Sequence, residues 1–285
     1  MKNLLKSDFY RARKDKVLFI GLMVTIGLVL MQVLLSKAML MASSAASDDA
    51  EQVGGLLGTT GLALWSNGVS ILGNTTQMLI PIFLTIFIVK EFSDRTIRNK
   101  LILGYSRSQI YGSILIVHAV ISLVYYFGAS SVGLLFGCLL FGLGATFNAE
   151  VFGMIVVGFI IQFLLSYVLI GFAIIFAINK QSLVLGILLP IAIGFVISIF
   201  GLVAILNVNQ TFTKVLSFFN FYQANELQQM VHISELTMTT WIEQGEDIRY
   251  ALPLTPLARI LITTPIAIIL EIVIGYFRFN KVQFK

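Results

Sequence analysis

Long apolar stretches with few or no charged side chains are the feature that most constrains this chain. The stretches span residues 17–35, 69–89, 113–141, 151–178, 183–206 and 257–277. Each contains about 20 residues or more, and a helix of that length crosses the ~30 Å hydrocarbon core of a bilayer. Backbone N–H and C=O groups find no water there, so a spanning segment must pair them within a helix. The pattern predicts an all-α, polytopic integral membrane protein with six transmembrane helices in one domain.

The composition excludes an ordinary soluble domain. Hydrophobic residues make up 58% of the 285 residues and charged residues only 12%, whereas soluble domains are about 25% charged. The net charge of +5 would suit nucleic acid, but the basic residues lie beside the apolar stretches. That placement is typical of a membrane orientation signal, so we expect a lipid bilayer, and no nucleic acid, as a partner.

The positive charges also predict the side of the membrane on which each segment lies. Four of the 19 lysines and arginines fall on one side of the expected bilayer, namely Lys37, Lys214, Arg249 and Arg259. The other fifteen fall on the opposite side, in the tail 1–16, the loop 90–112, the connection after the fourth span and the C-terminal tail. The side richer in Lys and Arg is cytoplasmic. We therefore expect a multi-pass plasma-membrane protein with both termini in the cytoplasm and an external segment at 207–256.

The loop 90–112 has the pattern of a short, charged, amphipathic helix. Acidic and basic residues are spaced four apart, with the acid first, which favours ion pairs along a helix. The pairs are Glu91 with Arg95 and Asp94 with Arg98, and the apolar stripe is Ile97, Leu101 and Phe92. The alternative interpretation is a membrane-surface loop whose charges serve orientation alone.

A joint follows this helix. Gly104 suits the left-handed position that ends a helix. Ser106 with Gln109 three residues later predicts a capping box that begins another helix, which continues into the third span. An amphipathic helix with a short link to a transmembrane helix can transmit a push from a cytoplasmic partner.

The same loop resembles that of a known family. The run Glu91-Phe-Ser-Asp-Arg-Thr-Ile-Arg-Asn-Lys-Leu, followed by Gly104-Tyr-Ser-Arg, is similar to the loop between spans two and three in permease subunits of type-2 ABC exporters. Family members often have Gly-Thr-Ile-Arg after an acidic residue, so Asp94-Arg95 before Thr96-Ile97 is a departure. The overall order of segments, with a basic first helix and a larger outer segment before the last span, is also similar.

The resemblance implies a transport subunit and its partners. The loop would be a coupling helix that docks on an ABC ATPase supplied in trans, and a second permease subunit would complete a homodimer or heterodimer. The residues implied in ATPase coupling are Glu91, Asp94, Arg95, Ile97, Arg98 and Leu101. Residues 1–16 look like the interfacial connecting helix of the family. Family members export amphipathic or antimicrobial peptides, drugs or sodium, and the sequence does not select one of these substrates.

The motifs of several enzyme classes are missing from the sequence. It has no Gly-Lys dipeptide and hence no Walker A phosphate loop, so an ATPase would be a separate subunit. Neither His-Glu-x-x-His nor Gly-x-Ser-x-Gly occurs, and the single cysteine, Cys138, cannot form a disulfide within the chain. We expect no catalytic, cofactor-binding or metal-binding residues.

Polar residues within the predicted spans are candidates for a substrate path. They are Asn74, Gln77, His118 and Glu271. The alternative for each is a structural role, as an interhelical hydrogen bond or a bond near the interface. Ala129, Gly133 and Gly137 recur every four residues and predict a close helix contact, within one bundle or at a dimer seam. Two other functional classes stay open: an ATP-independent channel or secondary carrier, and a membrane sensor or scaffold that does not transport.

Overall fold

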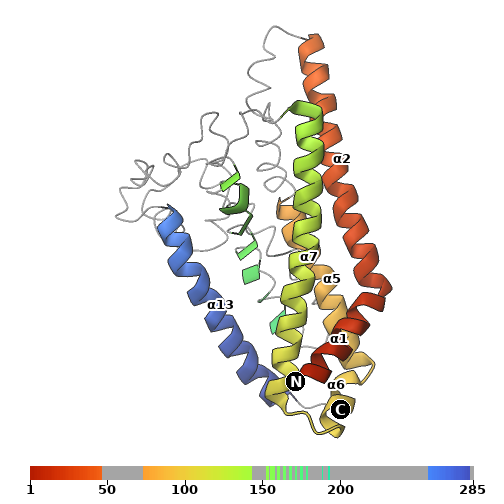
Figure 1. The fold of residues 1–285 in the computed structure, drawn as a ribbon, viewed down its shortest axis with the longest axis vertical. Coiled ribbons are helices and arrows are strands. Elements are labelled where there is room, and N and C mark those ends of the chain that lie inside the picture. The colour runs from red at the N-terminus through yellow and green to blue at the C-terminus, as the bar shows by residue number, and fades with distance from the viewer. Residues whose placement is uncertain are drawn as a thin grey trace.

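The computed structural model describes residues 1–46, 73–142 and 256–282, together with scattered positions between 152 and 192. Every secondary-structure element in these ranges is an α-helix (Figure 1). The helices are α1 Lys2–Lys14, α2 Lys16–Ala46, α5 Gly73–Ser93, α6 Thr96–Ile102, α7 Arg107–Phe141 and α13 Pro256–Lys281. The predicted all-α class is confirmed for this part of the chain. The segment 183–206, apart from single positions, and the segment 207–256, apart from the first residue of α13, lie outside it.

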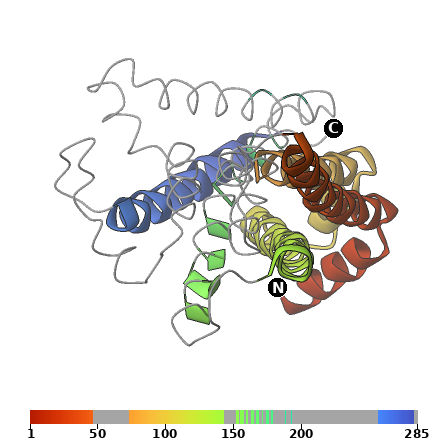
Figure 2. The same ribbon diagram turned by 90° about the horizontal axis from the view of Figure 1, so that it is seen from above.

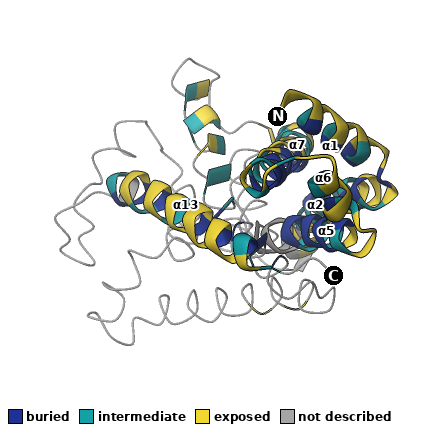
Figure 3. Ribbon diagram, turned by 90° about the horizontal axis from the view of Figure 1, so that it is seen from below, coloured by how far each residue is buried: buried dark blue, intermediate teal, exposed yellow. Residues whose placement is uncertain are grey.

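Three of these helices are long and apolar enough to cross a membrane. The candidate spans are Lys16–Ala42, Arg107–Phe141 and Ala258–Lys281. They correspond to the first, third and sixth predicted spans. Large apolar side chains lie exposed along their outer faces, including Phe19 and Met23 of α2 and Ile269 and Leu270 of α13 (Figure 3). Lipid would cover this apolar surface, which water disfavours.

The helices α2, α5 and α7 form one packed group, and α13 lies to its side (Figure 2). The small-residue face of α7 packs against α2, because Gly133 leaves room for Val29. A Cβ at position 133 would lie 3.2 Å from Cγ1 of Val29. Ala129 and Gly137 are buried on the same face. The predicted close contact therefore occurs within one bundle.

Helix α13 meets α7 at the end of the bundle where α1 lies. The guanidinium of Arg107, at the start of α7, donates to the carbonyl oxygens of Asn280 and Val282, the latter at 3.2 Å. From this contact the two helices diverge along their length (Figure 1). The N-terminus and the end of α13 consequently lie at the same end of the bundle.

The helix α2 is longer than the first predicted span. It continues past residue 35 to Ala46, because the following residues contain neither proline nor glycine to stop it. Lys37 in this extension donates to the carbonyl oxygen of Leu140 at 3.0 Å. Its ammonium group also lies 4.8 Å from the ring centre of Phe141. A basic side chain thus pairs with the carbonyl end of α7, which carries partial negative charge.

The loop 90–112 differs in part from its prediction. The amphipathic helix is broken at Asp94 and Arg95, and Arg95 adopts a left-handed φ of 55°. Because the helix does not continue through this break, residues four apart across it no longer lie on one face. The predicted pairs of Glu91 with Arg95 and of Asp94 with Arg98 are therefore wrong. The break turns α6 so that its own buried face points into the bundle. Sequence spacing alone cannot show such a turn, because tertiary packing determines it.

The joint after α6 is confirmed. Gly104 has a φ of 87°, the left-handed conformation that side chains disfavour. Ser106 caps α7 and forms the complete capping box with Gln109. The N–H of Gln109 donates to the Ser106 hydroxyl at 3.3 Å, and the N–H of Ser106 donates to the Gln109 side chain at 3.1 Å. The start of the third span is therefore anchored within a few residues of α6.

The positive φ at Gly104 leads to a stability prediction. We expect Gly104→Ala to lower the free energy of unfolding by about 1 kcal/mol, because an L side chain is strained in the left-handed region. Gly27→Ala is the matched control, since Gly27 lies inside α2 with open space around it. The control should leave stability unchanged or raise it. Thermal unfolding of both variants in the same detergent measures the difference, and equal effects would contradict the prediction.

Candidate functional site

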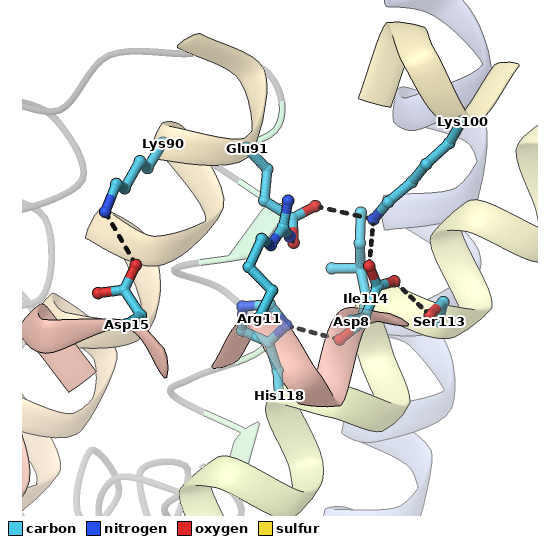
Figure 4. A network of polar contacts seen from close by, with 9 residues as sticks. All are labelled: Asp8, Arg11, Asp15, Lys90, Glu91, Lys100, Ser113, Ile114 and His118. Atoms are coloured by element: carbon cyan, nitrogen blue, oxygen red, sulfur yellow. Dashed lines mark hydrogen bonds and ion pairs between the residues drawn. The ribbon is translucent and has the colours of Figure 1, made fainter. Parts of the chain in front are cut away.

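A group of four charged residues lies where the loop 90–112 meets the first helix; three of them are buried and Arg11 is half-buried. Asp8 and Arg11 come from α1, Glu91 from the end of α5, and Lys100 from α6 (Figure 4). We refer to these four residues as the charge cluster. Asp8 and Arg11 lie far in the sequence from Glu91 and Lys100, and three helices supply the four residues.

Helix α1 places Asp8 in the cluster because of its spacing. Leu4, Asp8 and Ala12 recur every four residues and so share one face, which is buried. Asp8 retains only 3% of its surface exposed. Its two carboxylate oxygens are both bonded, one to Lys100 and one to the hydroxyl of Ser113 on α7, which donates at 2.7 Å. Asp8 therefore joins the first helix to the third predicted span.

Glu91 and Lys100 enter from the two sides of the helix break. Glu91 lies in the last turn of α5 and is 4% exposed. Lys100 and Ile97, three residues apart on α6, form its buried face. The ammonium of Lys100 lies 2.8 Å from Oδ1 of Asp8 and 3.3 Å from Oε2 of Glu91. Arg11 forms a second ion pair with Glu91. The two acids and two bases alternate in a chain of pairs.

Burial makes this cluster sensitive to the loss of any member. Removing a charge from water costs several kcal/mol, and the opposite charge must offset this. Burial lowers the pKa of Lys100, and the hydrogen bond to Asp8 opposes that shift. Burial also lowers the pKa of Arg11, against the attraction of Asp8 and other nearby carboxylates. The pairs therefore keep each other charged.

The connection between α1 and α2 reinforces the same region. Asp15 lies between the two helices with extended backbone. Its carboxylate accepts from the N–H of Val17 at 2.8 Å, which caps α2. Lys90, next to Glu91, pairs with the other oxygen at 2.9 Å. Two consecutive residues of α5 thus join it to this region: Glu91 to α1 and Lys90 to the connection between α1 and α2.

His118 lies in the core beneath the charge cluster. Its ring is fully buried, and Nδ1 donates to the carbonyl oxygen of Ile114 at 2.6 Å. The ring centre of Phe87 lies 5.8 Å from that of His118, and Arg11 lies 5.3 Å from the centre of the same Phe87 ring. These contacts give His118 a structural environment. Its place on a substrate path stays a prediction.

The six residues implied in coupling fall into two groups. Glu91 and Ile97 are buried and Leu101 is half-buried, so they contact the bundle itself. A direct contact with a partner would require Glu91 to leave its two cations. The exposed members are Asp94, Arg95 and Arg98.

Two apolar side chains continue the exposed side of α6. Ile102 is 73% exposed and Leu103 is 75% exposed. We refer to Arg95, Arg98, Ile102 and Leu103 as the outer surface of α6. Arginine is enriched at protein–protein interfaces and the centre of such an interface is apolar, so this surface is compatible with a protein partner. The six residues named from the sequence include both arginines but neither of these two apolar residues, although the implied contact range 91–103 contains them.

Three other residues were predicted to line a path. Asn74 and Gln77 belong to the first turns of α5, but their side chains lie outside the described part. Glu271 lies within α13 and is buried. Within the described ranges, no three His, Cys, Asp or Glu side chains come together in a way that could hold a metal ion.

Sequence reasoning missed Asp8, Arg11 and Lys100 as members of one site. A signal for Asp8 was present, because it is an acid on the apolar face of a basic helix, between Leu4 and Ala12. Lys100 carried a similar signal beside Ile97 and Leu101. An ionisable residue on an apolar face needs a partner of opposite charge or a hydrogen bond, but only the tertiary structure shows which residue that partner is.

Comparison with known protein families finds no match, and comparison with curated proteins finds no similar sequence.

Removal of Lys100, the central cation, tests the contribution of the charge cluster to stability. We expect Lys100→Met to cost about 3–5 kcal/mol of stability, because Asp8 and Glu91 would stay buried with less compensation. Arg98→Met is the matched control, as an exposed cation on the same helix, and should change stability by less than about 0.5 kcal/mol. Denaturant unfolding in detergent measures both variants.

A second substitution separates charge from packing. Adding Asp8→Asn to Lys100→Met should recover part of the lost stability, because one uncompensated carboxylate is removed. If the two losses simply add, the pairing between Asp8 and Lys100 carries no energy, and the role given to the cluster is wrong.

Proposed function

We propose that the chain is the membrane-spanning permease subunit of an ATP-binding-cassette exporter. In this proposal it crosses the plasma membrane six times, with both termini, α1 and α6 on the cytoplasmic side. A separate ATPase subunit supplies the energy, and a second permease subunit completes the path. The transported substrate is an amphipathic or antimicrobial peptide, or a drug.

The two-sided character of α6 is the observation that carries this proposal. Its outer surface offers Arg95, Arg98, Ile102 and Leu103 to a partner. Its inner face is held to the bundle by Ile97 and by the two ion pairs of Lys100. A helix that served orientation alone would need neither the buried ion pairs nor the exposed apolar residues.

The contacts of α6 supply a route for force. The short joint at Gly104 and the capped start at Ser106 link α6 to α7. Lys100 links it to α1 through Asp8 and to α5 through Glu91. A displacement of α6 by an ATPase would therefore move the ends of three helices together. Such a movement changes access to a path between two subunits.

One observation favours a second candidate function. Glu271 is a buried acid within a candidate span, and intramembrane acids are typical of proton- or ion-coupled carriers. An ATP-independent carrier would transport substrate as the purified chain alone. The exporter would require the ATPase subunit, so reconstitution with and without that subunit separates the two candidates.

The outer surface of α6 provides the central functional test. We expect Arg95→Glu combined with Arg98→Glu to abolish substrate-stimulated ATP hydrolysis and transport, because the docking surface would repel its partner. Arg13→Glu is the control, as an exposed basic residue of α1 outside this surface. Co-purification with the ATPase subunit and vesicle transport are the measurements. Normal binding and transport by the double variant would contradict the coupling role.

The proposed orientation has its own test. In a Cys138→Ser background, cysteine introduced at Arg98 should react with a membrane-impermeant maleimide only in inside-out vesicles. Cysteine introduced at Asp247 should react only in right-side-out cells. The reverse pattern would invert the topology and remove the exporter proposal.

A further inference from the structure

Glu271 occupies an environment unlike that of the other buried glutamate. It lies in α13 and is 5% exposed, almost the same as Glu91 at 4%. Glu91 is paired with Arg11 and Lys100. Neither carboxylate oxygen of Glu271 has a hydrogen-bond partner in the described structure. Two acids of almost equal burial thus differ in their partners: one is neutralised by cations, and the other has no described partner.

A small cavity adjoins the carboxyl group, between α7, α13 and a neighbouring segment. Its lining includes Tyr111 and Leu115 of α7, Ile268 of α13, and Tyr167, Gly171 and Ile174. Among the described residues that line the cavity, none is a lysine, arginine or histidine. The carboxyl group lies directly against Gly171, where a Cβ would overlap its oxygen. The fold therefore accommodates the acid without supplying a cation.

The two tyrosines that face Glu271 bond elsewhere. The hydroxyl of Tyr111 donates to the carbonyl oxygen of Ile272 at 3.2 Å. The hydroxyl of Tyr167 donates to the carbonyl oxygen of Leu115 at 3.5 Å. In the part of the chain that the structure describes, these are the titratable groups that α7 and the neighbouring segment present to the cavity. With their protons directed to the backbone, neither is placed to stabilise a carboxylate.

We propose that Glu271 is a proton-binding site inside the helix bundle, uncharged in this conformation. An isolated carboxylate in an apolar interior is so costly that the group takes up a proton instead. When α7 and α13 separate and water enters, the O–H bond breaks and the proton passes to water. Protonation is thereby linked to the packing of α13 on α7. This inference does not depend on ATP or on the exporter proposal.

The test compares isosteric neutral substitutions at the two buried glutamates. Glu271→Gln mimics a protonated acid and should raise the thermal unfolding temperature at neutral pH, because the unfolded variant cannot gain free energy by ionising as the unfolded wild type does. Glu91→Gln removes a charge that pairs with two cations, and should lower that temperature. Equal destabilisation by the two substitutions would overturn the proposal.

The pH dependence of unfolding of the full chain in lipid nanodiscs adds a site-specific readout. A group that is neutral in the fold but ionised when unfolded stabilises the protein at low pH, and this contribution is lost as pH rises. The wild type should therefore lose more stability at alkaline pH than Glu271→Gln. Identical pH profiles would overturn the proposal even if both proteins fold.

Chemical modification can detect the protonated carboxyl group. Dicyclohexylcarbodiimide adds to a protonated carboxyl group: the proton moves to a carbodiimide nitrogen, the oxygen bonds to the central carbon, and the adduct rearranges to a stable N-acylurea without a leaving group. Mass spectrometry should find this adduct on Glu271 at neutral pH, decreasing at alkaline pH, and not on Glu91. Modification of Glu91 to the same extent would overturn the proposal.

Discussion

The pairing of Lys100 with both Asp8 and Glu91 is the interaction on which this end of the structure depends. One ammonium group holds carboxylates from α1 and α5, and Asp8 in turn accepts a hydrogen bond from α7. Because all these groups are buried, each one would be costly without the others. The geometry of α6 follows from this requirement, since the break at Arg95 turns Lys100 inward and leaves the arginines outside.

This arrangement gives α6 two distinct faces with different tasks. The inner face is bound to three helices by ions and apolar contacts, and the outer surface is free of such contacts within the described chain. In the proposed coupling role, these inner contacts would carry a displacement of α6 to α1, α5 and α7. Glu271, at the interface of α7 and α13, would respond to the same movement, because its protonation depends on how closely those helices pack.

Much of the helical framework was predictable because its causes are local. Apolar length predicts the helices that could cross a membrane, a left-handed glycine predicts the end of α6, and Ser106 with Gln109 predicts the start of α7. The charged residues of the loop were misassigned for the opposite reason. Spacing four apart permits Glu91 to pair with Arg95, but it cannot compare that partner with Arg11, which is 80 residues away in the sequence.

The sequence by itself determined that this chain is apolar, helical and asymmetric in charge, because those properties depend on composition and on neighbours along the chain. Only the tertiary structure decided which charges are buried and with whom they pair. Desolvation depends on every segment that surrounds a group. The two buried glutamates therefore differ: Glu91 lies between two cations, and Glu271 lies against a glycine, with no cation among the described residues that line its cavity.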